Sequence, residues 1–268
     1  MVGLVVLALL ALLALGGQHI APYDCKAQPD IIALKSVAPS LAHPFGTDQY
    51  SRDVLSRIIC GSRVSLSVAF LSVIVAVTVG TTYGAVAGYV GGMTDTALMR
   101  FLDALMAIPR VLLLIAVATL WRGLGITGLV LLLGLTGWFG VSRLVRTLVI
   151  GARQDEFVTA ARALGASNAR ILAHHILPQV VSPVLVAATL AIGNVIVIEA
   201  GLTYLGMGVP MPYASWGSIF YDGMDSPFLS TWWVALFAGA ALVVTVLAVN
   251  LVADGLRDAL NTRQLPPR

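Results

Sequence analysis

The chain has 268 residues, of which 58% are hydrophobic and only 11% are charged. An ordinary soluble core cannot hide so much apolar surface, so this composition excludes a soluble globular protein and indicates a polytopic membrane protein. We expect the lipid bilayer to be its solvent, and we expect no nucleic-acid partner.

In chain order, five stretches without Asp, Glu, Lys or Arg are each long enough to cross the hydrocarbon core of a bilayer, about 30 Å, as a helix. They are Met1 to Tyr23, Val64 to Thr94, Gly123 to Ser142, Ile171 to Ile198 and Ser226 to Ala253. Another apolar segment, Thr96 to Leu120, is also long enough although it contains charged residues, and we count it as a sixth span. The predicted fold is therefore an all-α membrane protein with about six transmembrane helices.

We predict a single transmembrane domain over residues 1–268. Its parts are an N-terminal helix at about 1–20, an external loop at about 21–63, core helices at about 64–253 with a cytoplasmic loop at about 151–178, and a cytoplasmic tail at 254–268. Placing both termini in the cytoplasm puts nine Lys and Arg residues inside and six outside, as the positive-inside rule favours. Cys25 and Cys60 both fall in the first loop, where a disulfide and two unpaired thiols are open alternatives.

A basic segment without a catalytic group interrupts the apolar runs from Glu156 to Pro178. Within it, an apolar set recurs at helical spacing, which predicts a short amphipathic helix with this set on one face. The set is Phe157, Ala160, Ala161 and Leu164. The polar residues of the same helix fall on its other faces.

Gly165 suits the left-handed position that follows this helix. Ser167 or Asn168 can then cap a second short helix, and Pro178 is predicted to break its hydrogen-bond pattern at the next membrane entry. Spacing alone leaves two alternatives for this pair of helices. They rest at the lipid interface with their arginines among the headgroups, or they form a docking surface for a partner protein.

A pattern of small and apolar residues in the same segment resembles the EAA loop of ATP-binding-cassette importer membrane subunits. Its members are Ala160, Ala161, Gly165, Leu177 and Pro178. Thr159 stands where an acid is usual in that family, and His175 stands where a branched apolar residue is usual. The resemblance implies that the segment is a coupling helix that sits in a groove of the cytoplasmic ATPase.

Four other segments resemble the dipeptide, oligopeptide and nickel permease group, and they follow one another in the same order. They are His43 to Leu66, Gly88 to Pro109, Glu199 to Ile219 and Asn250 to Arg263. The resemblance covers the chain from about Ala42 to Arg263. Within the group, the chain most resembles the C-type subunit, which pairs with a B-type permease chain.

The resemblance implies the type I importer permease fold and a role in ATP-driven import of short peptides across the bacterial cytoplasmic membrane. The implied partners are a B-type permease subunit, one or two cytoplasmic ATPase subunits and an extracytoplasmic substrate-binding protein. ATP and Mg are expected on the ATPase subunits, and no cofactor or metal is expected on this chain. The residues implied for ATPase coupling are Glu156, Thr159, Ala160, Ala161, Gly165, Ala166, Leu177 and Pro178.

Both lysines of the chain, Lys26 and Lys35, lie in the first loop, and neither ends a G-x-x-x-x-G-K-[ST] phosphate-binding pattern. The ATPase is therefore expected on another chain, and this chain is not expected to be an enzyme. Nickel and haem are alternative substrates for the same class of importer. A membrane scaffold and an ion-coupled secondary transporter are alternatives of other classes, although the coupling carboxylates and paired broken helices of a secondary transporter are not evident.

Polar residues inside the predicted spans are costly and tend to face a cavity or a partner. The candidates for a substrate pathway are Asp103, Arg110, Asn194 and Glu199. Arg110 either snorkels, pairs with Asp103 across subunits, or attracts a peptide carboxylate through its guanidinium group. Glu199 either meets a peptide amino terminus or makes a hydrogen bond between helices. The loop before the last span is expected to be ordered and to place Trp216 at the membrane interface.

Overall fold

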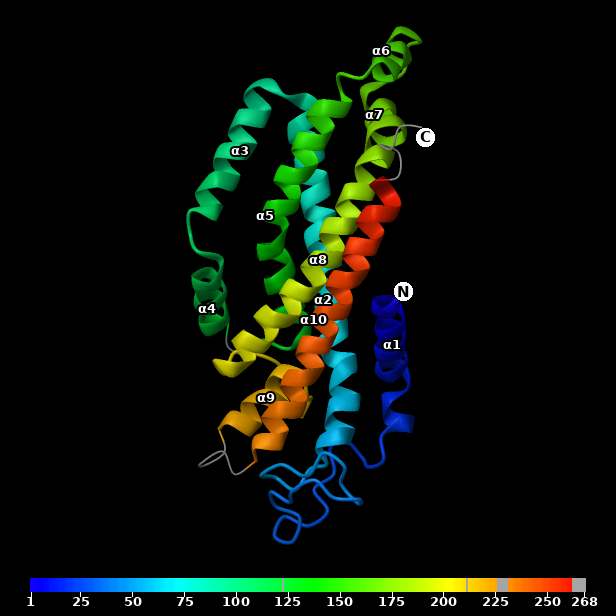
Figure 1. Ribbon diagram of the computed structural model, residues 1–268. Helices are drawn as coiled ribbons and strands as arrows, with labels where there is room; N and C mark the ends of the chain where they lie inside the picture. The colour runs from blue at the N-terminus through cyan, green and yellow to red at the C-terminus, as the bar shows by residue number, and fades with distance from the viewer. Residues whose placement is uncertain (122, 211, 226–230, 262–268) are drawn as a thin grey trace. The chain divides into compact units, whose positions relative to one another are not determined.

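The computed structural model describes residues 1–121, 123–210, 212–225 and 231–261, and this part of the chain is mainly helical (Figure 1). Five helical segments within it are long and apolar enough to cross a membrane. They are α1 (Val2–Ile20), α2 (Val54–Val90), α5 (Ile126–Ala152), the segment Asn168–Tyr204, which ends in α8 (Leu177–Tyr204), and α10 (Trp232–Asn261). The predicted all-α membrane fold is confirmed.

The sixth predicted span, Thr96 to Leu120, is broken into two helices. α3 (Gly92–Met106) and α4 (Arg110–Leu120) are bent by 76° at the break between them. Pro109 lies at this break, and its ring disfavours helical backbone at the residue before it. The described part of the chain therefore has six candidate spans only if the bent pair is counted as one.

The long helices extend beyond the uncharged stretches from which they were predicted. α2 begins at Val54, well before its predicted start, because Arg57 and Arg63 lie within the helix instead of ending it. The Asp53 carboxylate accepts the backbone N–H of Ser56 at 2.8 Å and so satisfies a free donor of the first turn. A charge marks the end of an apolar run, but it does not stop a helix that continues beyond the bilayer core.

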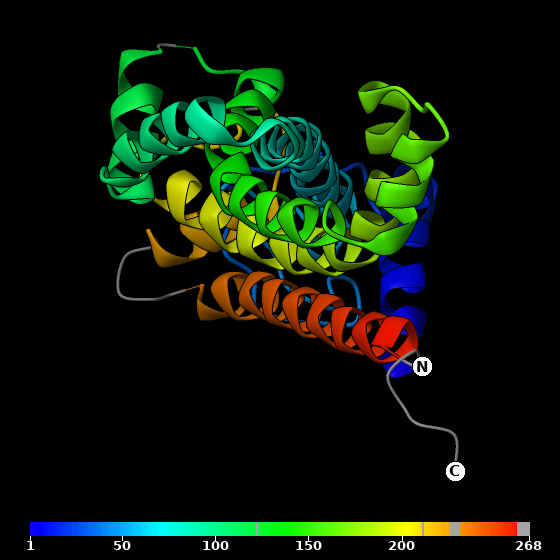
Figure 2. The same ribbon diagram turned by 90° about the horizontal axis from the view of Figure 1, so that it is seen from above.

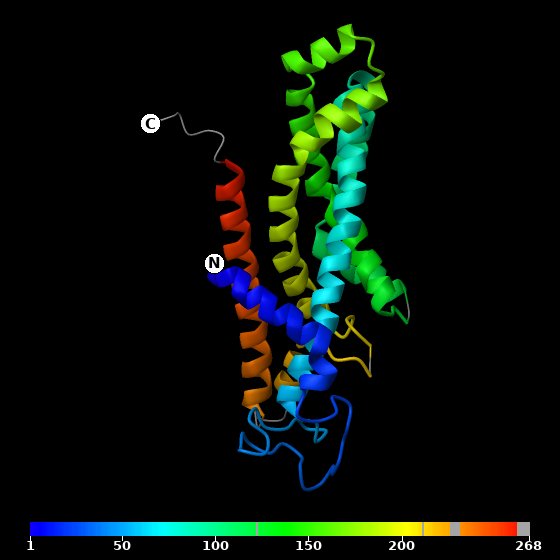
Figure 3. The same cartoon turned by 90° about the vertical axis from the view of Figure 1, so that its right-hand side faces the viewer.

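The described chain forms two compact units, and the first is drawn from residues 1–71, 118–130 and 192–252. In this unit the C-terminal end of α1 lies against the first turns of α2 (Figure 3), where a Cβ atom on Gly17 would lie 3.2 Å from the carbonyl oxygen of Ile59. Cys25 forms a disulfide with Cys60, so of the two alternatives for these cysteines the structure contains the bond. The buried apolar centre of the unit is made of Val54, Trp216, Ile219, Trp233, Val234 and Ala238.

The second unit is drawn from residues 72–117, 131–191 and 253–261. Within it, α5 and the later turns of α2 lie side by side (Figure 2). Gly80, Gly84 and Gly88 of α2 face α5, and a Cβ atom on Gly84 would lie only 2.3 Å from the carbonyl oxygen of Ser142. Glycines spaced four residues apart on one helix face let two membrane helices approach closely.

Candidate coupling site

The helix α6 (Glu156–Ala163) and a glycine turn form the first half of the predicted coupling segment. Gly165 has a φ of +83°, which is the left-handed conformation predicted for it. The N–H of Gly165 donates to the carbonyl of Arg162 at 3.0 Å, and the N–H of Ala166 donates to the carbonyl of Ala161 at 3.1 Å. These two bonds form a Schellman motif, which closes α6 and determines the direction of the chain beyond it.

The glycine turn leads into α7 (Asn168–Ile171), a second short helix that Ser167 caps. The Ser167 hydroxyl accepts the backbone N–H of Arg170 at 3.4 Å, so the predicted cap is confirmed. The Tyr89 hydroxyl of α2 donates to the side-chain oxygen of Asn168 at 2.9 Å. This bond ties α7 to the end of α2.

The predicted break in the hydrogen-bond pattern lies directly before Pro178, but the helix does not end there. Between α7 and α8 the backbone forms a π turn, Leu172–Ile176, in which the N–H of Leu177 donates to the carbonyl of Leu172, five residues earlier. A π turn shifts the hydrogen-bond pattern by one residue just before the proline, whose own N–H is missing. The helix therefore continues through Pro178 into α8.

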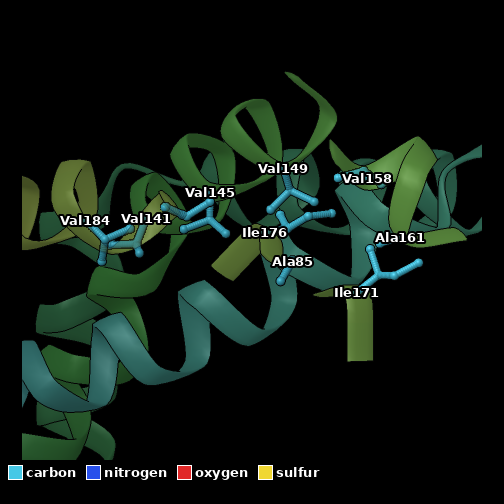
Figure 4. Packing of buried hydrophobic residues seen from close by; sticks show 10 residues of the cluster. Ala85, Val141, Val145, Val149, Val158, Ala161, Ile171, Ile176 and Val184 are labelled. Carbon is cyan, nitrogen blue, oxygen red and sulfur yellow. The ribbon is translucent and has the colours of Figure 1, made fainter. Parts of the chain in front are cut away.

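One apolar cluster holds the two short helices against the long ones (Figure 4). Its buried members come from α2, α5, α6, α7, the π turn and α8, and they are Ala85, Val141, Val145, Val149, Val158, Ala161, Ile171, Ile176, Val180 and Val184. Where these helices cross the bilayer, close packing of such side chains stabilises the arrangement through van der Waals contact. Because Val158 and Ala161 belong to this cluster, α6 is packed into the second unit and does not lie loosely on it.

α6 turns one face into this cluster, which we call the coupling cluster, and exposes the other. Phe157, Ala160 and Leu164 are exposed, and Leu164 is 89% exposed. The predicted apolar face is thus divided, because Ala161 points inward with Val158 whereas its three predicted companions point outward. Val158 was not among the predicted residues, although it precedes Ala161 by three residues, a spacing that places two residues on one helix face.

The remaining residues predicted for coupling lie around the exposed side of α6 and at the entry to α8. Glu156 and Thr159 are exposed on α6, and Pro178 is exposed at the start of α8. Ala166 and Leu177 are half-buried, and both pack against the coupling cluster. The structure therefore brings the predicted coupling residues into one region. Some of them pack against the rest of this chain, and the others are exposed.

Two of the predicted pathway residues, Asp103 and Arg110, lie in the second unit and are engaged by different parts of α5. The Asp103 carboxylate accepts from Arg143 at 2.5 Å, and both side chains are about half exposed. Arg110 donates to the carbonyl of Leu133 at 3.1 Å and to the hydroxyl of Thr136 at 3.4 Å. Its guanidinium group is thus turned onto α5.

The other two, Asn194 and Glu199, lie on the part of α8 that belongs to the first unit. Asn194 is exposed, whereas Glu199 is only 1% exposed. The Oε1 atom of Glu199 accepts the hydroxyl of Thr203 at 2.9 Å and that of Ser215 at 2.8 Å. Ser215 lies beyond the end of α8, at the N-cap of α9. Of the two alternatives for Glu199, the structure therefore contains the hydrogen bond between helices.

A short helix that the sequence analysis did not predict, α9 (Trp216–Met224), fills much of the loop before α10. The Ser215 hydroxyl accepts the N–H of Ser218 at 3.2 Å, and the Ser218 hydroxyl accepts the N–H of Ser215 at 2.9 Å, which together form a capping box. Trp216 is 1% exposed, and its indole N–H donates to the carbonyl of Ile58 in α2 at 3.0 Å. The expectation that Trp216 lies at the membrane interface is therefore wrong, because its ring belongs to the core of the first unit.

Four charged side chains fasten α9 to the external loop and to α2. Arg52 donates to Asp48 at 2.7 Å and to Asp222 at 2.8 Å, and Arg57 donates to the same carboxylates at 2.5 and 2.9 Å. Asp48, Arg57 and Asp222 are buried, and the cluster is neutral because its two positive and two negative charges balance. Removal of one member of such a buried cluster is strongly destabilising, because it leaves an uncompensated charge.

Comparison with known proteins identifies the class to which this helical chain belongs. Residues 80–265 match the family described as "Binding-protein-dependent transport system inner membrane component". The chain belongs to this family, and it is a multi-pass membrane component of a transport system that depends on a binding protein.

Its relatives include named permeases of two Bacillus subtilis (strain 168) transport systems. The dipeptide transport system permease protein DppC is 34% identical over 98% of this chain and 81% of its own length, and the oligopeptide transport system permease protein OppC is 35% identical over 98% and 85%. DppC of Alkalihalophilus pseudofirmus is 40% identical over 84% of this chain and 73% of its own length. A solved structure of the MetNI methionine ABC transporter, titled as inward-facing, matches 76% of this chain and 96% of its own with a TM-score of 0.60, and at 20% identity it shows the likeness of the fold alone.

Proposed function

We propose that this chain is the C-type permease subunit of an ATP-driven importer of short peptides. The relatives named as dipeptide and oligopeptide permeases support the substrate class. The observation that carries the coupling role is the division of α6 into a face buried in the coupling cluster and an exposed face of Phe157, Ala160 and Leu164. A helix that transmits force must be fixed to the elements it moves, and the burial of Val158 and Ala161 among residues of α2, α5 and α8 fixes α6 in this way.

The exposed face of α6 is the proposed contact with a cytoplasmic ATPase. The residues proposed for this contact and for its shape are Glu156, Thr159, Ala160, Gly165 and Ala166, with Ala161 packed behind them and Leu177 and Pro178 at the entry to α8. When the ATPase subunits close on ATP, α6 moves, and the coupling cluster passes this movement to α2, α5 and α8 together. Rigid-body rocking of the helices then alternates access to the substrate path.

The proposed complex also contains a B-type permease subunit, one or two ATPase subunits that bind ATP and Mg, and an extracytoplasmic substrate-binding protein. This chain lies in the bacterial cytoplasmic membrane with both termini and α6 on the cytoplasmic side, and it contributes no catalytic residue. The Cys25–Cys60 disulfide supports this orientation, because disulfides persist in oxidising compartments. Cys60 lies in the first turns of α2, whereas Tyr89, near the last residue of the same helix, bonds to α7 of the coupling segment.

Purification of the chain together with its neighbouring subunits tests the proposed function. We expect two ATPase chains and the B-type permease to co-purify, and we expect the peptide-loaded binding protein to stimulate ATP hydrolysis and peptide uptake in proteoliposomes. A single chain that imports peptide on its own under an ion gradient would contradict the proposal and would favour a secondary transporter.

We further propose that Asp103, Arg110, Asn194 and Glu199 lie along or beside the substrate path, with Arg110 attracting the peptide carboxylate. Arg110→Ala is expected to reduce uptake of an unmodified tripeptide about tenfold or more, the factor that corresponds to one charge-assisted hydrogen bond. Uptake of the same peptide with an amidated C-terminus should change much less. Arg100→Ala, at an exposed position on α3, is the control for loss of a charge. Equal losses for both peptides would rule out recognition of the carboxylate.

A further inference from the structure

Glu199 occupies an unusual position for an ionisable residue of a membrane span, because its side chain is 1% exposed. Ionisable groups in such segments are costly and require partners. Its Oε1 atom accepts two hydroxyls, but its Oε2 atom is buried and has no hydrogen-bond partner among the residues that the structure describes. Buried polar atoms without a partner are rare in native proteins, so the unpaired oxygen of this carboxyl requires an explanation.

The Ser215 hydroxyl joins this carboxyl to the beginning of α9. It donates to Glu199 Oε1 at 2.8 Å and accepts the backbone N–H of Ser218, so one oxygen atom serves both the bond to α8 and the cap of α9. Two residues after Ser215, a Cβ atom on Gly217 would lie 2.6 Å from the Cα atom of Ala200. The first turn of α9 is therefore in direct backbone contact with α8 beside Glu199.

The later turns of α9 are held by a different part of the first unit. Asp222 accepts from Arg52 and Arg57, which belong to the external loop and to the first turns of α2. α9 thus bridges α8 and the beginning of α2. These ion pairs of Asp222 do not involve Ser215, so loss of the hydroxyl bond changes how α9 follows α8 without detaching α9 from the protein.

We propose that Glu199 and Ser215 are positioning residues for transport, because their hydrogen bond makes α9 follow the movement of α8. The inference rests on the proposed function, in which the coupling segment moves α8. The helical segment Asn168–Tyr204 runs from α7 of the coupling segment to the turn that follows Glu199, so it connects the two sites through continuous backbone. Through this bond, the position of α9 depends on whether the ATPase subunits are open or closed.

Three variants of the complete importer, reconstituted into proteoliposomes with its binding protein and a labelled tripeptide, test this inference. Ser215→Ala removes both the bond to Glu199 and half of the capping box. Ser218→Ala removes the other half of the box and the bond from the Ser218 hydroxyl to the Ser215 carbonyl, and Ser215→Thr retains the hydroxyl. The measured quantity is the number of ATP molecules hydrolysed for each peptide imported. We expect Ser215→Ala to raise this ratio about two- to tenfold, as the loss of one typical hydrogen bond predicts, and we expect the other two variants to keep the wild-type ratio.

The inference is overturned if Ser215→Ala and Ser218→Ala have the same ratio, or if Ser215→Thr does not restore it. The yield and thermal midpoint of each complex are measured in parallel, because a purely structural role lowers these values and leaves the ratio unchanged. A wild-type complex without peptide-stimulated ATP hydrolysis would overturn the proposed function itself. A normal wild-type complex with an unaltered Ser215→Ala ratio would overturn only the positioning role.

Discussion

Gly165→Pro is expected to abolish peptide import while the chain still inserts into the membrane. Gly165 has a φ of +83°, whereas proline holds φ near −65°. Proline also lacks the N–H that donates to the carbonyl of Arg162 in the Schellman turn. The two effects together cost about 3 kcal/mol or more, so α6 loses the orientation in which its exposed face is presented. Peptide uptake and ATP hydrolysis by the reconstituted complex measure the loss.

Two milder glycine variants separate the effect of disturbing the Gly165 turn from the general effect of replacing a glycine. Gly165→Ala keeps the N–H but places a side chain in the left-handed region at a cost of about 1–2 kcal/mol, so a partial loss of import is expected. Gly151→Ala lies in α5 with open space around the added Cβ atom, and it should import normally. Full import by Gly165→Pro would show that the turn has no part in coupling.

Val158→Asp is expected to detach α6 from the second unit and to abolish import. Val158 is 0% exposed and lies among apolar side chains of the coupling cluster. The substitution removes about 1.5–3 kcal/mol of apolar burial, and an unpaired carboxylate in this place costs several kcal/mol more. The thermal midpoint of the purified complex and its peptide uptake should both fall.

Thr159→Asp is the matched control, because it introduces the same charge one residue later on the exposed side of α6. A negative charge near the N-terminal end of a helix is favourable, and this variant places an acid where the EAA loop has one. We expect a change in stability within about 0.5 kcal/mol, so the thermal midpoint of this variant should stay near the wild-type value. An equal fall in thermal midpoint for Val158→Asp and Thr159→Asp would contradict an α6 that buries Val158 and exposes Thr159.

The two short helices of the coupling segment were predictable because their signals are local. The left-handed position after a helix favours glycine, as at Gly165. The free N–H groups at the start of a helix favour a hydroxyl cap, as at Ser167. The buried face of α6 was not predictable in the same way. Apolar residues occupy two sides of this helix, and only its contacts with α2, α5 and α8 determine that Val158 and Ala161 are the buried pair.

The structure differs from other predictions at places where a tertiary contact or a neighbouring turn outweighs the local preference of a residue. Pro178 interrupts the hydrogen-bond pattern as predicted, but the π turn before it lets the helix continue into α8. Trp216 belongs to a loop rich in glycine and proline, yet the capping box of α9 and the bond to Ile58 place it in the core. The bond between Arg52 and Asp222 joins residues 170 positions apart, a separation at which spacing carries no information.

The glycine row on α2 also limits how this protein can change over evolutionary time. Gly80, Gly84 and Gly88 lie so close to α5 that a methyl group on any of them would meet backbone or side-chain atoms at less than 3 Å. A substitution there is tolerated only if the facing residues shift as well, so single-step drift at these positions is blocked. Other residues of the same helices, such as Val86 on α2 and Leu135 on α5, are exposed in this chain and have more room to vary. Sequence divergence between related permeases should therefore accumulate on the outer surfaces of α2 and α5, while the distance between the two helices stays constant.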